Sequence, residues 1–184
     1  MFKAIISLFL WPIWFLYLLI ILPVFLIFIL IVNKNYFHYF LRPMSYFFCL
    51  LGGQLIKQTG IIPDPKYWPY LYLFNPQSLF AHFVIGTYIN HYVTAVAKHE
   101  HLSYPLWGQV AKFYGIVPIN RTNIKKALSS LKIVEDSIVN DKVSVLIAPE
   151  GTRTRDGYLG VFKKGAFHIA KNTGVKIIPV IIDG

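Results

Sequence analysis

Acidic residues and cysteine are both scarce in this sequence. Eight Asp and Glu residues stand against eighteen Lys and Arg, so the formal net charge is +10 at pH 7. This balance favours anionic partners: nucleic acid, anionic lipid headgroups or phosphorylated substrates. The single cysteine, Cys49, excludes an intrachain disulfide, gives no sign of an oxidising compartment and removes the usual zinc patterns. Because the scattered histidines form no helical pair either, we predict neither a metal site nor a cofactor.

Charged residues are also missing from a long N-terminal run, Ala4 to Val32. At about 1.5 Å per helical residue this run exceeds the roughly 30 Å hydrocarbon core of a bilayer, which selects lipid over nucleic acid as the partner. It is too long for the apolar part of a signal peptide, and no small-residue cleavage site follows it. Pro12 and Pro23 leave two forms open, a single span or two shorter helices that enter and leave one leaflet. Residues 1–34 are therefore predicted to be a transmembrane or re-entrant anchor.

The segment that follows the anchor is aromatic and carries breaks. Residues 35–69 contain Arg42, Pro43 and Gly52, which argue against a second full span and favour an interfacial segment followed by a linker. Lys34 and Arg42 come after the apolar run, whereas one lysine precedes it. The positive-inside tendency therefore places the rest of the chain on the cytoplasmic side of the membrane.

From residue 70 onward, strand patterns alternate with helix patterns. The expected strands are Tyr70–Phe74, Val143–Ala148 and Val175–Ile182, and the expected helices are one capped by Thr122 and one over Phe162–Asn172. This alternation predicts an α/β layered domain over residues 70–184 with a largely parallel sheet. The chain stops directly after a hydrophobic strand, which would leave a sheet edge open, so it is either a fragment or a short form.

Two motifs indicate a phosphate site. Ala148-Pro149-Glu150-Gly151-Thr152-Arg153 follows a buried strand, where backbone N–H groups and a Gly let an anion approach and an Arg can bind phosphate with two prongs. Gly115-Ile116-Val117-Pro118-Ile119-Asn120-Arg121 places a second Arg just before a helix N-terminus, which also favours anions.

The two motifs, in this order and spacing, with Lys98 before them and the strand around Pro179 behind, resemble the 1-acylglycerol-3-phosphate (lysophosphatidate) acyltransferase family. The resemblance runs from about Asn75 to Pro179. It implies that the glycerol phosphate of the acceptor is bound by Arg121, Glu150, Gly151, Thr152 and Arg153. It also implies that the segment around Pro179 shapes the acyl-donor site, that the donor is acyl-CoA or acyl-carrier protein, and that a typical member makes phosphatidate.

The first motif departs from the family. The family pattern is Asn-His-x-x-x-x-Asp, whereas this chain has Pro76 at the His position and Ala81 at the Asp position. An alcohol attacks a thioester slowly unless a base takes its proton, and an imidazole oriented by a carboxylate is the usual base. Because losing a general base costs about 10² to 10⁴ in rate, we expect transfer by this chain to be slow or absent.

The remaining histidines are weak substitutes for that base. If residues 76–82 formed one helix, His82 would lie about 240° round from position 76 and face elsewhere. His91, His99 and His101 lie between the first two motifs at no recognised spacing, so we expect solvated or hydrogen-bonded side chains. The lysines of the predicted helices are expected to face solvent, where they could also hold the domain on an anionic membrane; they are Lys125, Lys126, Lys132, Lys163, Lys164 and Lys171.

Three functional hypotheses remain. The first is a membrane-bound protein of glycerophospholipid synthesis whose ancestral reaction is acyl transfer to 1-acylglycerol-3-phosphate, and which is now slow or inactive. The second is a non-catalytic binder of lysophospholipid phosphate, or a regulatory partner of an active enzyme. The third is a decayed or truncated product that folds poorly.

Overall fold

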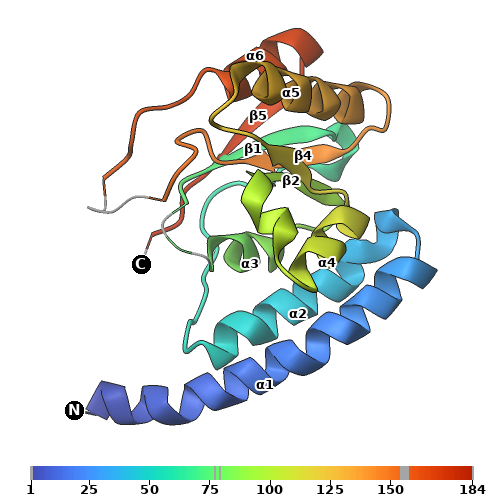
Figure 1. Cartoon of the computed structure of the whole chain (residues 1–184). Coiled ribbons are helices and arrows are strands. Elements are labelled where there is room, and N and C mark those ends of the chain that lie inside the picture. Colours follow the sequence, from blue (N-terminus) through green and yellow to red (C-terminus); the bar gives the residue numbers. More distant parts are fainter. Residues whose placement is uncertain (1, 77, 79, 154–157, 184) are drawn as a thin grey trace.

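The computed structural model describes residues 2–76, 78, 80–153 and 158–183 (Figure 1). The strands in this part of the chain are β1 Tyr70–Phe74, β2 Val93–Lys98, β3 Val117–Ile119, β4 Ser144–Ile147 and β5 Lys176–Val180. The helices are α1 Phe2–Ile31, α2 Phe37–Leu51, α3 Ala81–Gly86, α4 Trp107–Tyr114, α5 Ile124–Val139 and α6 Gly165–Thr173. Short 3-10 turns occur at η1 Lys34–Tyr36, η2 Pro65–Tyr67 and η3 His99–Ser103.

The strands form one parallel sheet in the order β3-β2-β4-β1-β5. Parallel neighbours need crossover connections, and helices supply them on both faces of the sheet. Figure 1 shows α5 and α6 above the sheet and α3 and α4 below it. The prediction of an α/β layered fold with a largely parallel sheet is confirmed.

The central strands are buried on both faces, as a parallel sheet covered by helices requires. Leu71 of β1 and Val145 of β4 are fully buried and pack with Val134 of α5 and Ile169 of α6 in one core cluster. On the other face, Tyr72 and Leu146 pack towards α3. Burying each large apolar side chain stabilises the fold by about 1.5–3 kcal/mol relative to leaving it exposed.

Two predicted helix starts were wrong by a few residues. The helix predicted from Phe162 begins at Gly165, because the backbone of Lys163 is still bound to the preceding loop, its N–H donating to Pro149 O at 2.8 Å. The cap of α5 is Asn123 and not Thr122, since the Asn123 side chain accepts from Lys126 N at 3.0 Å. The strand predicted at Tyr70–Phe74 agrees with β1 at both ends.

The N-terminal part of the chain forms a helical hairpin against the domain. α1 continues through Pro12 and Pro23 as one helix, so the division into two helices does not occur. Figure 1 shows α1 and α2 lying side by side along the lower face. Phe25 of α1 stacks on Phe40 of α2, with 5.3 Å between ring centroids, and it also contacts Tyr114 of α4.

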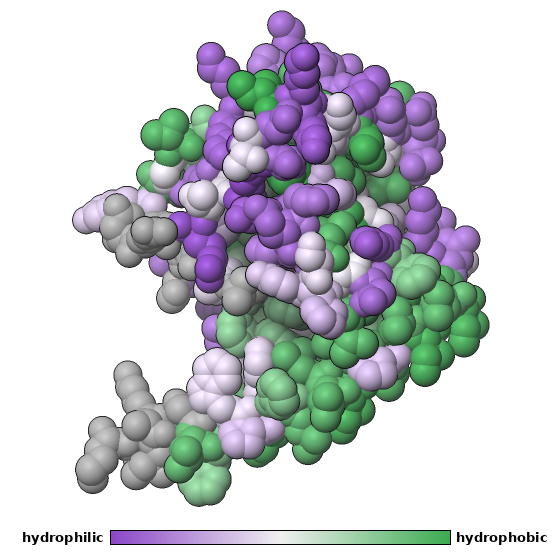
Figure 2. All heavy atoms as spheres, in the orientation of Figure 1, coloured by the Kyte–Doolittle hydropathy of each residue, from purple (hydrophilic) through white to green (hydrophobic). Residues whose placement is uncertain are grey.

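The outer surface of the hairpin is apolar. Within the described residues, Leu8–Ile31 is a 24-residue helix long and apolar enough to cross a membrane, and 11% of its most apolar window is buried. Figure 2 shows hydrophobic side chains gathered over the hairpin at the bottom, while hydrophilic ones cover the top of the domain. Exposed large apolar residues of the two helices include Leu8, Phe9, Trp11, Leu16, Leu19, Ile20, Ile27, Leu30, Ile31, Tyr39, Tyr46 and Phe47.

Candidate functional site

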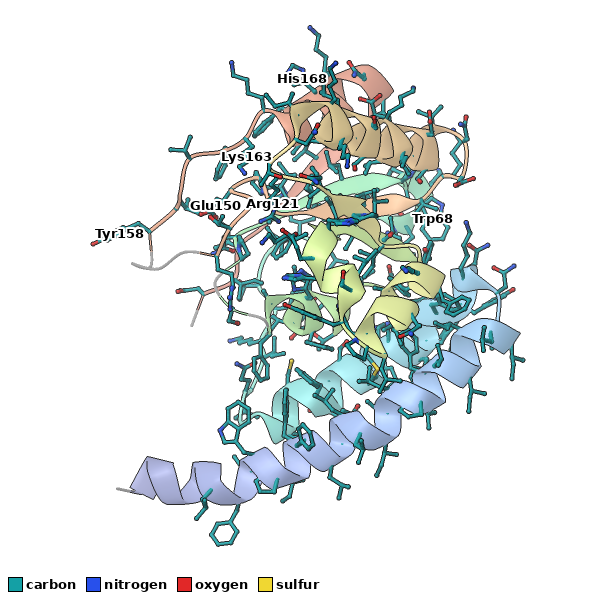
Figure 3. The ribbon with its side chains drawn as sticks, in the orientation of Figure 1. Trp68, Arg121, Glu150, Tyr158, Lys163 and His168 are labelled. Carbon is teal, nitrogen blue, oxygen red and sulfur yellow. The ribbon has the colours of Figure 1, made fainter. Side chains whose placement is uncertain are left out.

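Every segment with a predicted site residue follows the carboxyl end of a strand or lies within the last one. Asn75 follows β1, Arg121 follows β3, Glu150 follows β4, and Pro179 lies in β5. In a parallel sheet these ends meet at one edge, which is where ligands of open α/β sheets bind. Figure 3 shows Arg121, Glu150 and Lys163 grouped at this edge.

The loop after β4 is built around Gly151. This residue has φ +70°, a left-handed conformation that favours glycine, and its N–H donates to Ala148 O at 3.1 Å. A Cβ at this position would lie 3.0 Å from Lys163 Nζ, so the lysine packs directly over the glycine. The sequence pattern placed Lys163 on a solvent-facing helix, whereas the structure puts it at the loop.

Glu150 fixes this loop from inside. Its side chain is buried, with 6% exposed, and one carboxylate oxygen accepts the Gly160 N–H at 2.7 Å. The carboxylate therefore ties together two positions that lie ten residues apart in the chain. A carboxylate repels phosphate, so the resemblance-based assignment of Glu150 to phosphate binding fits an indirect role through loop shape.

Arg121 joins the second motif to the loop. Its Nη1 donates a hydrogen bond to Gly151 O. The Asn120 side chain shapes the turn, accepting from Thr122 N and Asn123 N, each at 3.0 Å. Burial lowers the pKa of Arg121, and Glu100 opposes that effect, but the guanidinium remains a cation because an arginine does not deprotonate in proteins.

His101 is a partly buried imidazole of η3, and its pKa is sensitive to the charged groups of the cationic loops. Its pKa is lowered first by burial, and then by repulsion from Arg121, Lys98 and Arg153, while Glu100 raises it. Arg153 and its neighbour Thr152 are exposed. Residue 101 matches no motif, so the sequence alone did not indicate that His101 lies at these loops.

The first motif loop has no described imidazole at its His position. Pro76 is buried, and Ala81, with 1% exposed, is the first residue of α3. Asn75 serves the fold: Nδ2 donates to Ile182 O at 2.9 Å, and Oδ1 accepts from Ile182 N at 2.7 Å. Two further motif positions, Gln77 and Leu79, lie outside the described residues.

The helical argument about His82 was wrong. α3 begins at Ala81, so Pro76 and His82 do not share a helix. His82 is exposed, and its ring meets Phe74 edge-on with 5.2 Å between centroids.

His91 forms a serine–histidine–asparagine array that is structural. Nε2 lies 3.0 Å from Ser144 Oγ, and Nδ1 lies 3.1 Å from Asn90 Oδ1. Ser144 has 1% exposed and its hydroxyl accepts the Tyr70 N–H, so no substrate reaches it. Tyr70 and Ser144 are the first residues of β1 and β4. The array therefore lies at the amino ends of the strands, whereas the candidate site lies at their carboxyl ends.

A cavity of about 730 Å³ adjoins the first motif on the side of β5, away from the cationic loops after β3 and β4. Ser78 and Phe80 of the first motif line it, together with Pro179 of β5. Further lining comes from residues 54–59 and 61–63, from α3 and from residues 178–183. Its volume falls within the range of about 300–1,000 Å³ that is typical of small-molecule sites.

Comparisons with known proteins agree with this geometry. The family model described as Acyltransferase matches residues 55–183, well over half of the chain. A 1-acyl-sn-glycerol-3-phosphate acyltransferase from Cocos nucifera is 38% identical over 114 residues, which cover 62% of this chain and 37% of that protein. One from Salmonella typhimurium is 34% identical over 112 residues, which cover 61% of this chain and 46% of that protein. The chain thus spans less than half the length of these curated relatives.

A solved structure shows the same fold. The crystal structure of the 1-acyl-sn-glycerophosphate (LPA) acyltransferase PlsC from Thermotoga maritima superimposes with a TM-score of 0.72 at 19% identity, covering 96% of this chain and 72% of that chain. At this identity the likeness carries the fold alone. Together with the match of the family model over residues 55–183, it leads to one conclusion: the chain belongs to the acyltransferase family.

Proposed function

We propose that this protein is a membrane-bound member of the lysophosphatidate acyltransferase type that binds the phosphate of 1-acylglycerol-3-phosphate and transfers acyl groups slowly or not at all. Acyl-CoA or acyl-carrier protein is the corresponding donor, and phosphatidate the product of the ancestral reaction. The observation that carries the proposal is the link from Arg121 to the Gly151 carbonyl beside Arg153.

The charge at the strand ends supports phosphate binding. Arg121, Arg153 and Lys163 bring three cations to the segments after β3 and β4. Lys98, at the end of β2, adds a fourth that is paired with Glu100. The Glu150 carboxylate accepts the Gly160 N–H at 2.7 Å, so its contribution to the site is to hold the loop. Arginine binds phosphate with paired hydrogen bonds, and the Arg121 and Arg153 guanidiniums retain donors for this purpose.

The cavity supports an acyl-chain site. The end of β2 and the loops after β3 and β4 carry the cations, whereas the cavity lies on the β1–β5 side, with Ile178, Pro179 and Val180 in its lining. The first motif follows β1 and therefore lies between the cationic loops and the cavity. A phosphate on one side and an acyl chain on the other would bring the hydroxyl and the thioester together at that motif.

The chemistry at the first motif supports slow transfer. Pro76 has no proton acceptor in its side chain, and Ala81 offers no carboxylate to orient one. Binding and proximity effects survive the loss, whereas the general-base contribution of about 10² to 10⁴ does not.

Binding and turnover together test the proposal. We expect lysophosphatidate to bind the detergent-solubilised protein, and Arg153→Ala to weaken binding by tenfold or more. Lys171→Ala is the matched control, because Lys171 is an exposed basic residue on α6. Binding that is unchanged in Arg153→Ala, or transfer as fast as that of an intact enzyme, would contradict the proposal.

A non-catalytic role is the second candidate, because neither Pro76 nor Ala81 has a side chain that can accept a proton. A lipid-phosphate binder or regulatory partner needs the phosphate site without the base. It predicts lysophosphatidate binding with no transfer, even with acyl-CoA and acyl-carrier protein donors supplied in excess.

We also propose that residues 1–34 anchor the protein within one leaflet, that residues 35–69 lie at the interface, and that residues 70–184 form the domain on the cytoplasmic side. One side of α1 packs on the protein through Phe25 and Ile29, which have 3% and 8% exposed, while its other side is apolar and exposed. A helix spanning perpendicular to the bilayer would have to pull that packed side away from Tyr92 and Val110.

Single-cysteine labelling distinguishes the two placements of α1. In a Cys49→Ala background, Lys3→Cys and Asn33→Cys flank the apolar run. In sealed vesicles, a membrane-impermeant maleimide should label both positions from the same side if α1 lies in one leaflet. Labelling from opposite sides would show that α1 spans.

A further inference from the structure

His101 lies where the cationic loops meet. It belongs to η3, which follows β2 and packs against β2, β3 and α4. β2 pairs with β3 on one side and β4 on the other, so η3 sits between the loops that carry Arg121 and Arg153. The ring stacks on Tyr104, with 5.8 Å between centroids and 25° between planes.

The charged groups around the imidazole are mostly positive. Its own segment supplies Lys98 and Glu100, which are paired at 3.1 Å. Arg121 and Arg153 act on it from the loops after β3 and β4, and the ionisable side chains of α4 are Lys112 and Tyr114. Partial burial lowers the pKa of His101 most, and repulsion by the cations lowers it further, so the imidazole is mostly neutral at pH 7 when no ligand is present.

We propose that His101 is a further phosphate-binding residue of this site, and that it takes up a proton when a phosphate monoester binds. The inference rests on the proposed function, since it assumes that the phosphate lies between Arg121 and Arg153. A bound dianion offsets the repulsion by those cations and favours the imidazolium. The resulting imidazolium donates a hydrogen bond to a phosphate oxygen.

The direction of proton exchange distinguishes this role from that of the phosphate itself. A phosphate monoester has a second pKa of about 6, and binding beside cations lowers it, so the ligand releases protons or exchanges none. If a proton is taken up at pH 7.5, it must therefore bind to a group of the protein. His99 offers a matched control, because it is an exposed histidine of the same turn.

The test is calorimetric titration of the detergent-solubilised protein with lysophosphatidate at pH 7.5, in two buffers of different ionisation enthalpy. We expect the native protein and His99→Gln to take up part of a proton per ligand bound, and His101→Gln to take up none. His101→Lys, which carries a permanent charge, should bind without uptake and confirm that position 101 tolerates substitution.

Equal proton uptake in the native protein and His101→Gln would overturn this inference while leaving the proposed function standing. Absence of lysophosphatidate binding by the native protein would overturn both.

Discussion

The guanidinium of Arg121 donates a hydrogen bond to the backbone oxygen of Gly151, thirty residues further along the chain. This contact ties the turn before α5 to the loop after β4. The contact makes Arg121 a support for the loop that carries Arg153, and the proposed function gives it a second role as a cation for the ligand. Arg121→Lys should therefore keep the charge but lose much of the affinity for lysophosphatidate, by about tenfold or more, because a lysine cannot bind loop and phosphate in the same fork geometry. Equilibrium binding measures this loss, and affinity equal to that of the native protein would show that charge alone is needed.

Glu150 should contribute to stability through the loop. Glu150→Ala leaves the Gly160 N–H without its partner, and we expect the free energy of unfolding to fall by about 1–3 kcal/mol. Glu150→Gln keeps an oxygen acceptor and should lose clearly less. Denaturant unfolding measures both losses. Glu100→Ala is the control, because Glu100 forms an exposed ion pair with Lys98 and its loss should change stability little. Equal losses in the Ala and Gln variants would argue against the hydrogen bond.

Restoring the first motif should restore chemistry. Pro76→His with Ala81→Asp supplies a base and its orienting carboxylate at the positions where the family has them. We expect the rate of acyl transfer to rise by about 10² to 10⁴ in the double variant, and far less in Ala81→Asp alone. The rate is measured with acyl-CoA and lysophosphatidate in vesicles. Unchanged turnover in a folded double variant would mean that the site lacks more than its base.

The buried array at His91 should make stability depend on pH. Burial lowers the pKa of His91 to about 4 in the folded protein, whereas an unfolded histidine titrates near pH 6.5. The unfolded state then binds more protons between these values, so stability is complete above about pH 6.5 and falls as the pH drops towards 4. His91→Asn should be less stable at pH 7.5 and lose part of this pH dependence. Unfolding curves from pH 7.5 to pH 4.5 test this, and an unchanged slope would contradict it.

Local patterns in the sequence predicted β1, β4, β5, α5 and α6, but not β2, β3, α3 or α4. They predicted the contacts between the elements poorly. β1 was predicted at both ends because a short β-prone run is bounded by Pro69 and Asn75. The positions of Lys163 and His101 could not be predicted, since each depends on a crossover that brings distant loops together. Glu150 matched a motif, yet its hydrogen bond to Gly160 joins residues ten positions apart, which no local pattern specifies.

The N-terminal helix decides between two forms that its prolines left open. Pro12 and Pro23 remove backbone donors, so two helices were a reasonable alternative to one. The structure keeps one helix, and the aromatic contacts of Phe25 and Phe28 with Phe37 and Phe40 hold its later part against α2. Such packing between helices is not visible in the local sequence.

The central claim is that Arg121 and Arg153 grip the same phosphate, and a double-mutant cycle on lysophosphatidate affinity tests it most directly. Arg121→Ala, Arg153→Ala and the double variant are compared with the native protein by equilibrium binding in vesicles. Groups that share one partner show coupling energies of about 0.5–3 kcal/mol, so the double variant should lose clearly less than the sum of the two single losses. Strictly additive losses, or no loss in either single variant, would contradict the account.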